Sequence, residues 1–144
     1  MKVSAILDHK GNFVASITPH SSVTEALRML AINGVGALVV SDDGHTIGGI
    51  ISERDIVRRL HDDAGTLTMR VHELMTVTVH TTKADCPVDT LMREMTDRRI
   101  RHVPVVDDNG QMIGIVSIGD AVKARLGELE GERSALIDYI TTGG

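Results

Sequence analysis

The chain has 144 residues, of which 42% are hydrophobic and 24% charged, as in ordinary folded domains. A net charge of −5 and the near absence of aromatic residues argue against a nucleic-acid surface, and runs such as Ala37–Val40 are far too short to cross a membrane. The lone cysteine, Cys86, cannot form an internal disulfide and favours a reducing, cytoplasmic location.

The first predicted unit begins with a short strand and ends with a helix. Asn33-Gly34 is typical of a helix C-terminus, and Asp42-Asp43-Gly44 predicts a tight turn between two strands. An exposed linker is expected around His61–Thr68. The predicted strand-helix-strand-strand-helix order occupies Phe13–Thr18, Val23–Asn33, Ala37–Val40, Gly49–Ile51 and Glu53–Leu60.

A second unit repeats this order. Sliding the sequence by 65 residues aligns Val23–Val57 with Val88–Val122 without a gap, and ten of the 35 positions are identical. Average residue usage would give roughly two or three identities, so the chain consists of two copies of one unit. The second copy places its elements at Thr76–His80, Val88–Arg99, His102–Val106, Gly114–Val116 and Gly119–Leu126.

The chain then continues as a further helical segment, Gly127–Ile140, which contains two glycines. Its apolar residues are Leu129, Leu136, Ile137 and Ile140. The preferred interpretation is a surface helix packed on the body, and the alternative is a protruding helix that pairs between subunits.

The sharpest motif occurs twice, as Gly49-Ile-Ile-Ser-Glu-Arg-Asp55 and Gly114-Ile-Val-Ser-Ile-Gly-Asp120. Serine followed three residues later by aspartate predicts a capping box at a helix start. The free amides of such a start also attract anions. A serine hydroxyl can donate to a phosphate, and a carboxylate can accept from ribose hydroxyls. The pattern therefore suits either a purely structural cap or sugar-phosphate recognition.

These doubled motifs, together with the segment Arg99-Ile-Arg-His-Val-Pro-Val-Val-Asp107, resemble the tandem CBS (cystathionine β-synthase) domain pair. The resemblance covers about residues 3–126. It implies an α/β (α+β) fold in which two β-α-β-β-α repeats, related by a pseudo-twofold axis, form one disc with two clefts. The expected division is repeat 1 at 1–64, repeat 2 at 65–127 and a helical tail at 128–144, and we expect a stand-alone pair without a catalytic domain.

The resemblance also implies roles for individual residues. Asp55 and Asp120 would hold ribose, while Ser52 and Ser117 would touch phosphate. The adenine slot would be lined by Gly36, Ala37 and Leu38 in one repeat, by His102, Val103 and Pro104 in the other, and by Thr18. The first repeat departs from the family pattern, because Val39 stands opposite Pro104.

Basic residues gather where an anion is expected. Arg54 lies within the first motif, and Arg101 and His102 begin the second hairpin. These last two alternate on a strand that should enter the core, where a buried guanidinium requires a partner such as phosphate. The aligned positions in the first repeat are Gly36 and Ala37, so we expect unequal clefts, with phosphate-rich ligands preferring the more basic one.

The sequence thus predicts a non-enzymatic regulatory module that binds an adenine nucleotide. AMP is the favoured ligand, with ADP, ATP, NAD and S-adenosylmethionine as further candidates. A nucleotide hydrolase and a ligand-free scaffold are the alternatives. We expect a homodimer through the helices after each motif, an unidentified regulated protein as partner, and neither nucleic acid, membrane nor metal as partner.

Overall fold

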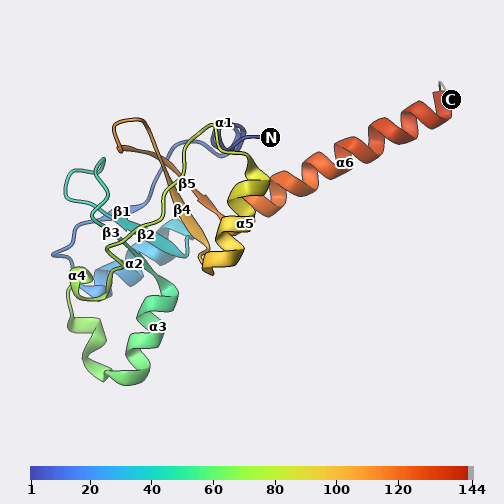
Figure 1. The fold of residues 1–144 in the computed structure, drawn as a ribbon. Coiled ribbons are helices and arrows are strands. Elements are labelled where there is room, and N and C mark those ends of the chain that lie inside the picture. The colour runs from blue at the N-terminus through green and yellow to red at the C-terminus, as the bar shows by residue number, and fades with distance from the viewer. Residues whose placement is uncertain (143–144) are drawn as a thin grey trace.

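The computed structural model describes residues 1–142 and contains two small sheets surrounded by helices (Figure 1). The elements follow the predicted repeat, with additional helices before each copy. They are α1 (Val3–Lys10), β1 (Ser16–Ile17), α2 (Val23–Asn33), β2 (Ala37–Val40), β3 (Gly49–Ser52), α3 (Glu53–Asp62), a 3-10 helix η1 (Ala64–Thr68), α4 (Val71–Leu74), α5 (Val88–Arg98), β4 (His102–Val106), β5 (Met112–Ser117) and α6 (Ile118–Thr142).

The two sheets confirm both predicted hairpins. In the first, β1 runs parallel to β2, and β2 pairs antiparallel with β3. In the second, β4 pairs antiparallel with β5. The strand predicted at Thr76–His80 is wrong: Thr76 forms a bridge with Ile50 of the other repeat, and the single residue Thr82 pairs in parallel with Val105. In the second repeat, the single residue Thr82 therefore takes the place that strand β1 has in the first repeat.

The predicted helix ends are largely confirmed. The Ser22 side chain accepts a hydrogen bond from the Glu25 amide at the start of α2, and Gly34 ends that helix in the left-handed conformation, with φ 62°. In the second repeat Arg99 takes the same left-handed conformation, with φ 55°, although it carries a side chain. The same turn is thus built with glycine once and with arginine once.

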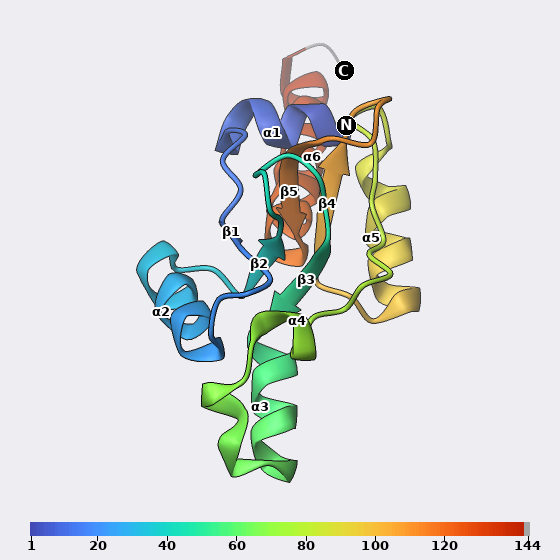
Figure 2. The same cartoon turned by 90° about the vertical axis from the view of Figure 1, so that its left-hand side faces the viewer.

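Each repeat is covered by the helix that precedes the other repeat. Helix α1 precedes the first copy, but its Val3 amide donates to the Cys86 carbonyl of the second, at 2.9 Å. Helix α4 precedes the second copy, but its Val71 amide donates to the Ser21 carbonyl of the first, at 2.8 Å. Figure 2 shows α1 lying beside β5 and α4 lying close to α3. The two copies therefore exchange their leading helices.

This exchange is built into the two hydrophobic cores. The first core joins the apolar faces of α2 and the first sheet with Val71 from α4. The second core joins α5, β4 and β5 with Val3, Ile6 and Leu7 from α1. Each core consequently contains residues from both halves of the sequence. The expected domain boundary between residues 64 and 65 therefore separates segments that pack into the same core.

The segment around His61–Thr68 is exposed at most of its residues, as expected, but it is helical rather than a simple linker, and the expectation for the C-terminal segment is corrected. The region expected as a linker, His61–Thr68, instead contains the end of α3 and the 3-10 helix η1, and Thr66 within it is fully buried. The segment expected to pack on the body is the second half of one continuous helix, α6, which projects away from both sheets (Figure 1). Its residues from Leu129 to Thr142 are all exposed, so the protruding alternative describes its placement.

Candidate functional site

Both Ser-x-x-Asp motifs form the predicted capping boxes. Ser52 accepts from the Asp55 amide at 3.2 Å, and Asp55 Oδ2 accepts from the Ser52 amide at 2.9 Å. Ser117 accepts from the Asp120 amide at 3.1 Å, and Asp120 Oδ2 accepts from the Ser117 amide at 2.9 Å. The caps stabilise the starts of α3 and α6, and they hold both carboxylates beside the ends of β3 and β5.

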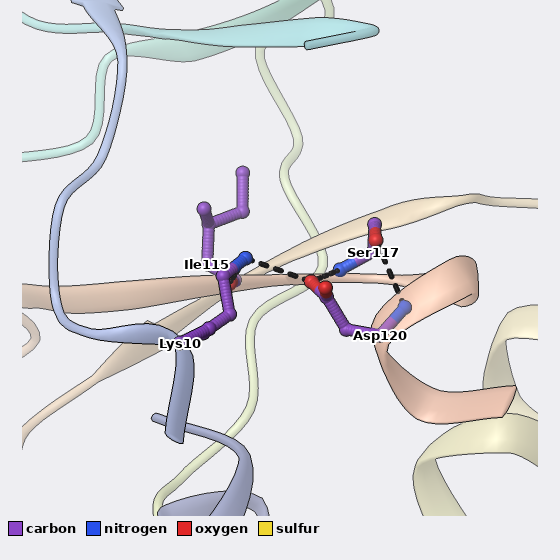
Figure 3. Close-up of polar contacts among 4 residues, drawn as sticks. All are labelled: Lys10, Ile115, Ser117 and Asp120. Atoms are coloured by element: carbon purple, nitrogen blue, oxygen red, sulfur yellow. Dashed lines mark hydrogen bonds and ion pairs between the residues drawn. The ribbon is translucent and has the colours of Figure 1, made fainter. Parts of the chain in front are cut away.

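The second box carries an additional cation, which the sequence analysis missed. Lys10, the last residue of α1, donates from Nζ to Asp120 Oδ2 at 2.7 Å and to the Ile115 carbonyl at 2.9 Å (Figure 3). Burial works to raise the pKa of Asp120, but the hydrogen bonds and charge of Lys10, together with Ser117, hold this pKa below its usual 3.8. Asp120 is therefore ionised and paired with Lys10.

The first box differs in how its carboxylate is satisfied. The Ser52 hydroxyl donates to Asp55 Oδ2 at 2.9 Å, whereas Lys10 donates to the equivalent oxygen of Asp120 at 2.7 Å. Within residues 1–142, Asp55 forms no ion pair. The two sites thus share a backbone geometry but differ in charge.

Gly36 and His102 bring the two repeats together. A Cβ added at Gly36 would lie 3.2 Å from both Cε1 and Nε2 of the His102 ring, so the ring rests against the glycine backbone. The Gly36 carbonyl also accepts from the Glu53 amide at 3.0 Å, which ties it to the first motif. His102 and the first motif are therefore neighbours although they belong to different repeats.

The surroundings of His102 favour a neutral ring. Burial is the largest influence and lowers the pKa of His102 below 6.5, against the opposing charge of Glu53. Arg101 and Lys10 lower this pKa further, while Asp120 raises it. His102 is therefore largely uncharged at pH 7, and it adds little charge to the cleft expected to be the more basic one.

Several residues expected in the adenine slot lie inside the protein instead. Ala37, Leu38, Val103 and Pro104 are buried, and Leu38 and Val103 are members of the two hydrophobic cores. Thr18 follows Ile17, which pairs with Val40, whereas Ser52 pairs with Ala37 at the opposite end of β2. The structure therefore brings Gly36 and His102 together, and it places Thr18 away from the first motif.

The arginines do not occupy the positions that the strand pattern suggested. Arg101 is exposed and precedes β4, so the expectation of a buried guanidinium in need of an anion is wrong. Its carbonyl accepts from the Ile118 amide at 2.8 Å, which gives it a backbone role at the second motif. Arg54 is also exposed, on the first turn of α3.

Two hollows lie elsewhere on the molecule. A groove follows α6 around Val122 and Leu126, and a pocket opens between Pro19 and Met75 at the Ser41 end of the first sheet. None of the predicted ligand residues lines either hollow. In the described part of the chain, no group of three metal-ligating side chains gathers, and no helix has the length and apolarity that crossing a bilayer requires.

Comparison with known proteins gives the family. The model of the CBS domain matches the chain twice, over residues 10–62 and 71–127. The chain belongs to the CBS domain family. A plant relative, the mitochondrial CBS domain-containing protein CBSX3 of Arabidopsis thaliana, is 38% identical over 136 residues; the match covers 88% of this chain and 63% of the plant protein.

Solved structures agree with the fold of this CBS pair. The CBS-domain containing protein ATU1752 of Agrobacterium tumefaciens superposes with a TM-score of 0.83 at 41% identity, covering 87% of this chain and 99% of that one. The protein PAE2072 of Pyrobaculum aerophilum, complexed with AMP, has a TM-score of 0.73 at 28% identity, with coverages of 83% and 89%. The CBS pair of protein MJ0100, in complex with 5′-methylthioadenosine and S-adenosylmethionine, has a TM-score of 0.73 at 32% identity, with coverages of 89% and 98%.

A second internal repeat in this CBS pair could have revealed the exchanged helices. Met1-Lys2-Val3 and Met69-Arg70-Val71 lie 68 residues apart and are closely similar. The Met1 carbonyl accepts from the first amide of α5, and the Met69 carbonyl accepts from the first amide of α2, both at 2.9 Å. The 65-residue alignment began only at Val23, so this short signal, and with it the position of Lys10, went unrecognised.

Proposed function

We propose that this CBS pair is a non-enzymatic sensor of adenine nucleotides, with AMP as the favoured ligand. The observation that carries the proposal is the pair of Ser-x-x-Asp helix starts, of which the second faces His102 and Lys10 and the first lies against Gly36. A helix start offers amides and a positive dipole to a phosphate, and its aspartate offers acceptors to a ribose. Similar CBS pairs were crystallised with AMP and with S-adenosyl ligands, which supports the same ligand class here.

In the proposed binding mode, Asp55 and Asp120 accept from ribose hydroxyls, and Ser52 and Ser117 donate to phosphate. Gly36 and His102 border the base. Leu38 and Val103 act through the cores, because their side chains have no exposed surface. We assign no catalytic role to the aspartates, since both are engaged by their own capping amides.

Ligand-dependent melting tests the proposal. At a concentration 100-fold above Kd, a single site adds about 2.7 kcal/mol to the free energy of unfolding, which raises the melting temperature by about 5–10 °C. AMP, ADP, ATP, NAD and S-adenosylmethionine are tested separately. Asp55→Asn and Asp120→Asn should each weaken one site. A melting temperature that none of these ligands raises at millimolar concentration would leave the ligand-free scaffold, and phosphate release from ATP would point to the hydrolase.

We further propose that the protein works as a homodimer. Helix α3 leaves Val57 66% exposed, and α6 leaves Leu126 56% exposed, beside the groove along its first turns. The projecting half of α6 adds Leu129, Leu136 and Ile140 at spacings of seven and four residues on one stripe. An isolated helix of this length that contains Gly131 is marginal in water, so a second copy that covers the stripe would stabilise it.

Sedimentation analysis of charge variants tests the dimer. Val57→Glu and Leu136→Glu should shift the protein toward the mass of one chain at micromolar concentration. Val77→Glu is the matched control, because Val77 is 69% exposed and lies outside α3 and α6. A wild-type protein that sediments as a single chain across this range would contradict the dimer.

Signalling follows from the position of the site where the two repeats meet. A ligand that contacts both Gly36 of one repeat and His102 of the other would favour one arrangement of the two repeats over another. A regulated partner that distinguishes these arrangements then senses the nucleotide. The reducing, cytoplasmic location stays a prediction from the lone cysteine.

A further inference from the structure

We propose that Lys10 makes the second repeat selective for ligands with a phosphate, in preference to ligands whose corresponding group is neutral or cationic. This inference rests on the proposed function, because it assumes that Asp120 holds a ribose. It assigns a specificity-determining role to a residue of α1, which lies outside the repeated unit and was not among the predicted site residues.

The position of Lys10 is determined by packing. Helix α1 lies directly on β5, where a Cβ at Gly114 would stand 2.6 Å from Leu7 Cδ2. Leu7 is buried at this contact, and Lys10 follows it by almost one turn of the same helix. This close approach, which a Cβ at position 114 would disturb, brings the ammonium group within hydrogen-bond distance of Asp120 and the Ile115 carbonyl (Figure 3).

The ion pair remains open to a ligand. The Lys10 and Asp120 side chains are 30% and 27% exposed, so the pair is shielded from solvent without being sealed off. An ammonium group has three donors, and the two bonds to protein leave one N–H for an incoming acceptor. The negative charge of Asp120 is already compensated by Lys10, and a phosphate that approaches this site is therefore not repelled by an uncompensated carboxylate.

Lys10 also changes the role of the neighbouring serine. In the first repeat, the Ser52 hydroxyl donates its hydrogen to Asp55 Oδ2. In the second, Lys10 donates to the equivalent oxygen of Asp120, and Ser117 adds to the hold on this carboxylate. Lys10 therefore keeps the Asp120 carboxylate paired when the Ser117 hydroxyl turns toward a phosphate, whereas Asp55 would lose the Ser52 hydrogen bond with no cation in its place.

The first repeat cannot supply an equivalent cation. Met75 contacts Gly49 as Leu7 contacts Gly114, but α4 ends at Leu74, just before this contact. The residue that corresponds to Lys10, 68 positions further on, is Thr78, which carries no charge. Asp55 has no ion-pair partner in the described chain, and this setting is better suited to a neutral or cationic ligand.

The test compares three probes that share an adenosine moiety and differ in the charge at the 5′ position: AMP with a phosphate, adenosine with a neutral hydroxyl and S-adenosylmethionine with a cationic sulfonium. Calorimetric titrations are performed on the full chain carrying Asp55→Asn, so that they report on the second repeat. We expect Lys10→Met to weaken AMP binding about tenfold, to leave adenosine binding within about twofold, and to strengthen S-adenosylmethionine binding. Lys10→Arg keeps the charge and should retain most of the preference for AMP.

Lys83→Met is the matched control. Lys83 donates to the Asp107 carbonyl at 3.0 Å and to Asp108 Oδ1 at 3.3 Å, so it is also a lysine bound to one carbonyl and one carboxylate, but at the β4–β5 turn. This variant makes the same change in net charge and should leave all three affinities unchanged. Circular dichroism of each variant verifies that the fold is intact.

The outcomes separate the two proposals. A ratio of AMP to adenosine affinity that Lys10→Met leaves unchanged, whether both affinities hold or both fall together, overturns the role of Lys10 and leaves the nucleotide sensor standing. A parent protein that binds adenosine as tightly as AMP also overturns it. A wild-type protein that binds none of the three probes overturns the proposed function, and this inference falls with it.

Discussion

The two repeats of this CBS pair begin their second helices alike, with Ser52 and Asp55 in one and Ser117 and Asp120 in the other, but the surroundings of the two carboxylates differ. Asp55 is satisfied by its own capping serine. Asp120 forms an ion pair with Lys10, which comes from the opposite end of the sequence. The two repeats therefore keep the same backbone geometry at the helix start, while the segments packed around each start determine the charge beside its aspartate.

The largest effect is expected from truncating the cores at aligned positions. Leu38 and Val103 are both fully buried, in the first and second core respectively. Leu38→Ala should lower the free energy of unfolding by about 3 kcal/mol and Val103→Ala by about 2 kcal/mol, since each leaves a cavity. Urea unfolding measures both. A loss of AMP binding with unchanged stability would show instead that Leu38 lines the ligand site.

Glycine-to-alanine changes under the exchanged helices should give the next largest effect. A Cβ at Gly49 would stand 2.9 Å from the rigid Thr76 carbonyl oxygen, whereas a Cβ at Gly114 meets the end of the Leu7 side chain. We expect Gly49→Ala to cost about 2 kcal/mol and Gly114→Ala about 1 kcal/mol, because a leucine side chain can shift more easily than backbone. Thermal unfolding compares the two, and a costlier Gly114→Ala would reverse this order.

The helix ends offer a smaller and opposite pair of effects. Gly34 and Arg99 occupy aligned positions in the same left-handed conformation. Arg99→Gly should raise the free energy of unfolding by up to about 1 kcal/mol, and Gly34→Arg should lower it by about the same amount. The measurement is chemical denaturation of both variants beside the wild type. Equal destabilisation by both changes would show that the Arg99 side chain contributes contacts that outweigh its backbone strain.

The smallest effect concerns the dependence of stability on pH. It arises at His102, whose aligned residue in the first repeat is Ala37. Burial lowers the pKa of His102 below 6.5 in the folded protein. At a pH between the folded and the unfolded pKa of this residue, the unfolded chain therefore binds more protons than the folded one. Stability from this residue is fully present above pH 6.5 and is lost as the pH falls through the folded pKa. His102→Gln should flatten the stability profile below pH 6.5, while His45→Gln, at an exposed position, should not. An unchanged slope in His102→Gln would contradict the neutral ring.

The sequence by itself determined the parts of this protein that depend on neighbouring residues. The duplicated order, both hairpins and both capping boxes were predicted, because turns and caps arise from side chains within about five residues of one another. The resemblance to CBS pairs rested on the same local motifs. The strand that failed, at Thr76–His80, lies where the chain crosses between the two repeats. Thr76 bridges to Ile50 of the first sheet, and Thr82, beyond the predicted strand, bridges to Val105 of the second.

Only the tertiary structure decided how the two copies fit together. Lys10 meets Asp120 across 110 positions of sequence, and no local pattern encodes a contact of that separation. Likewise the exposure of Arg101, the burial of Leu38 and the projection of α6 depend on which surfaces the two repeats leave open once they have packed. Burial and charge pairing are properties of the assembled fold, because both are set by atoms that become neighbours only when distant segments pack against one another.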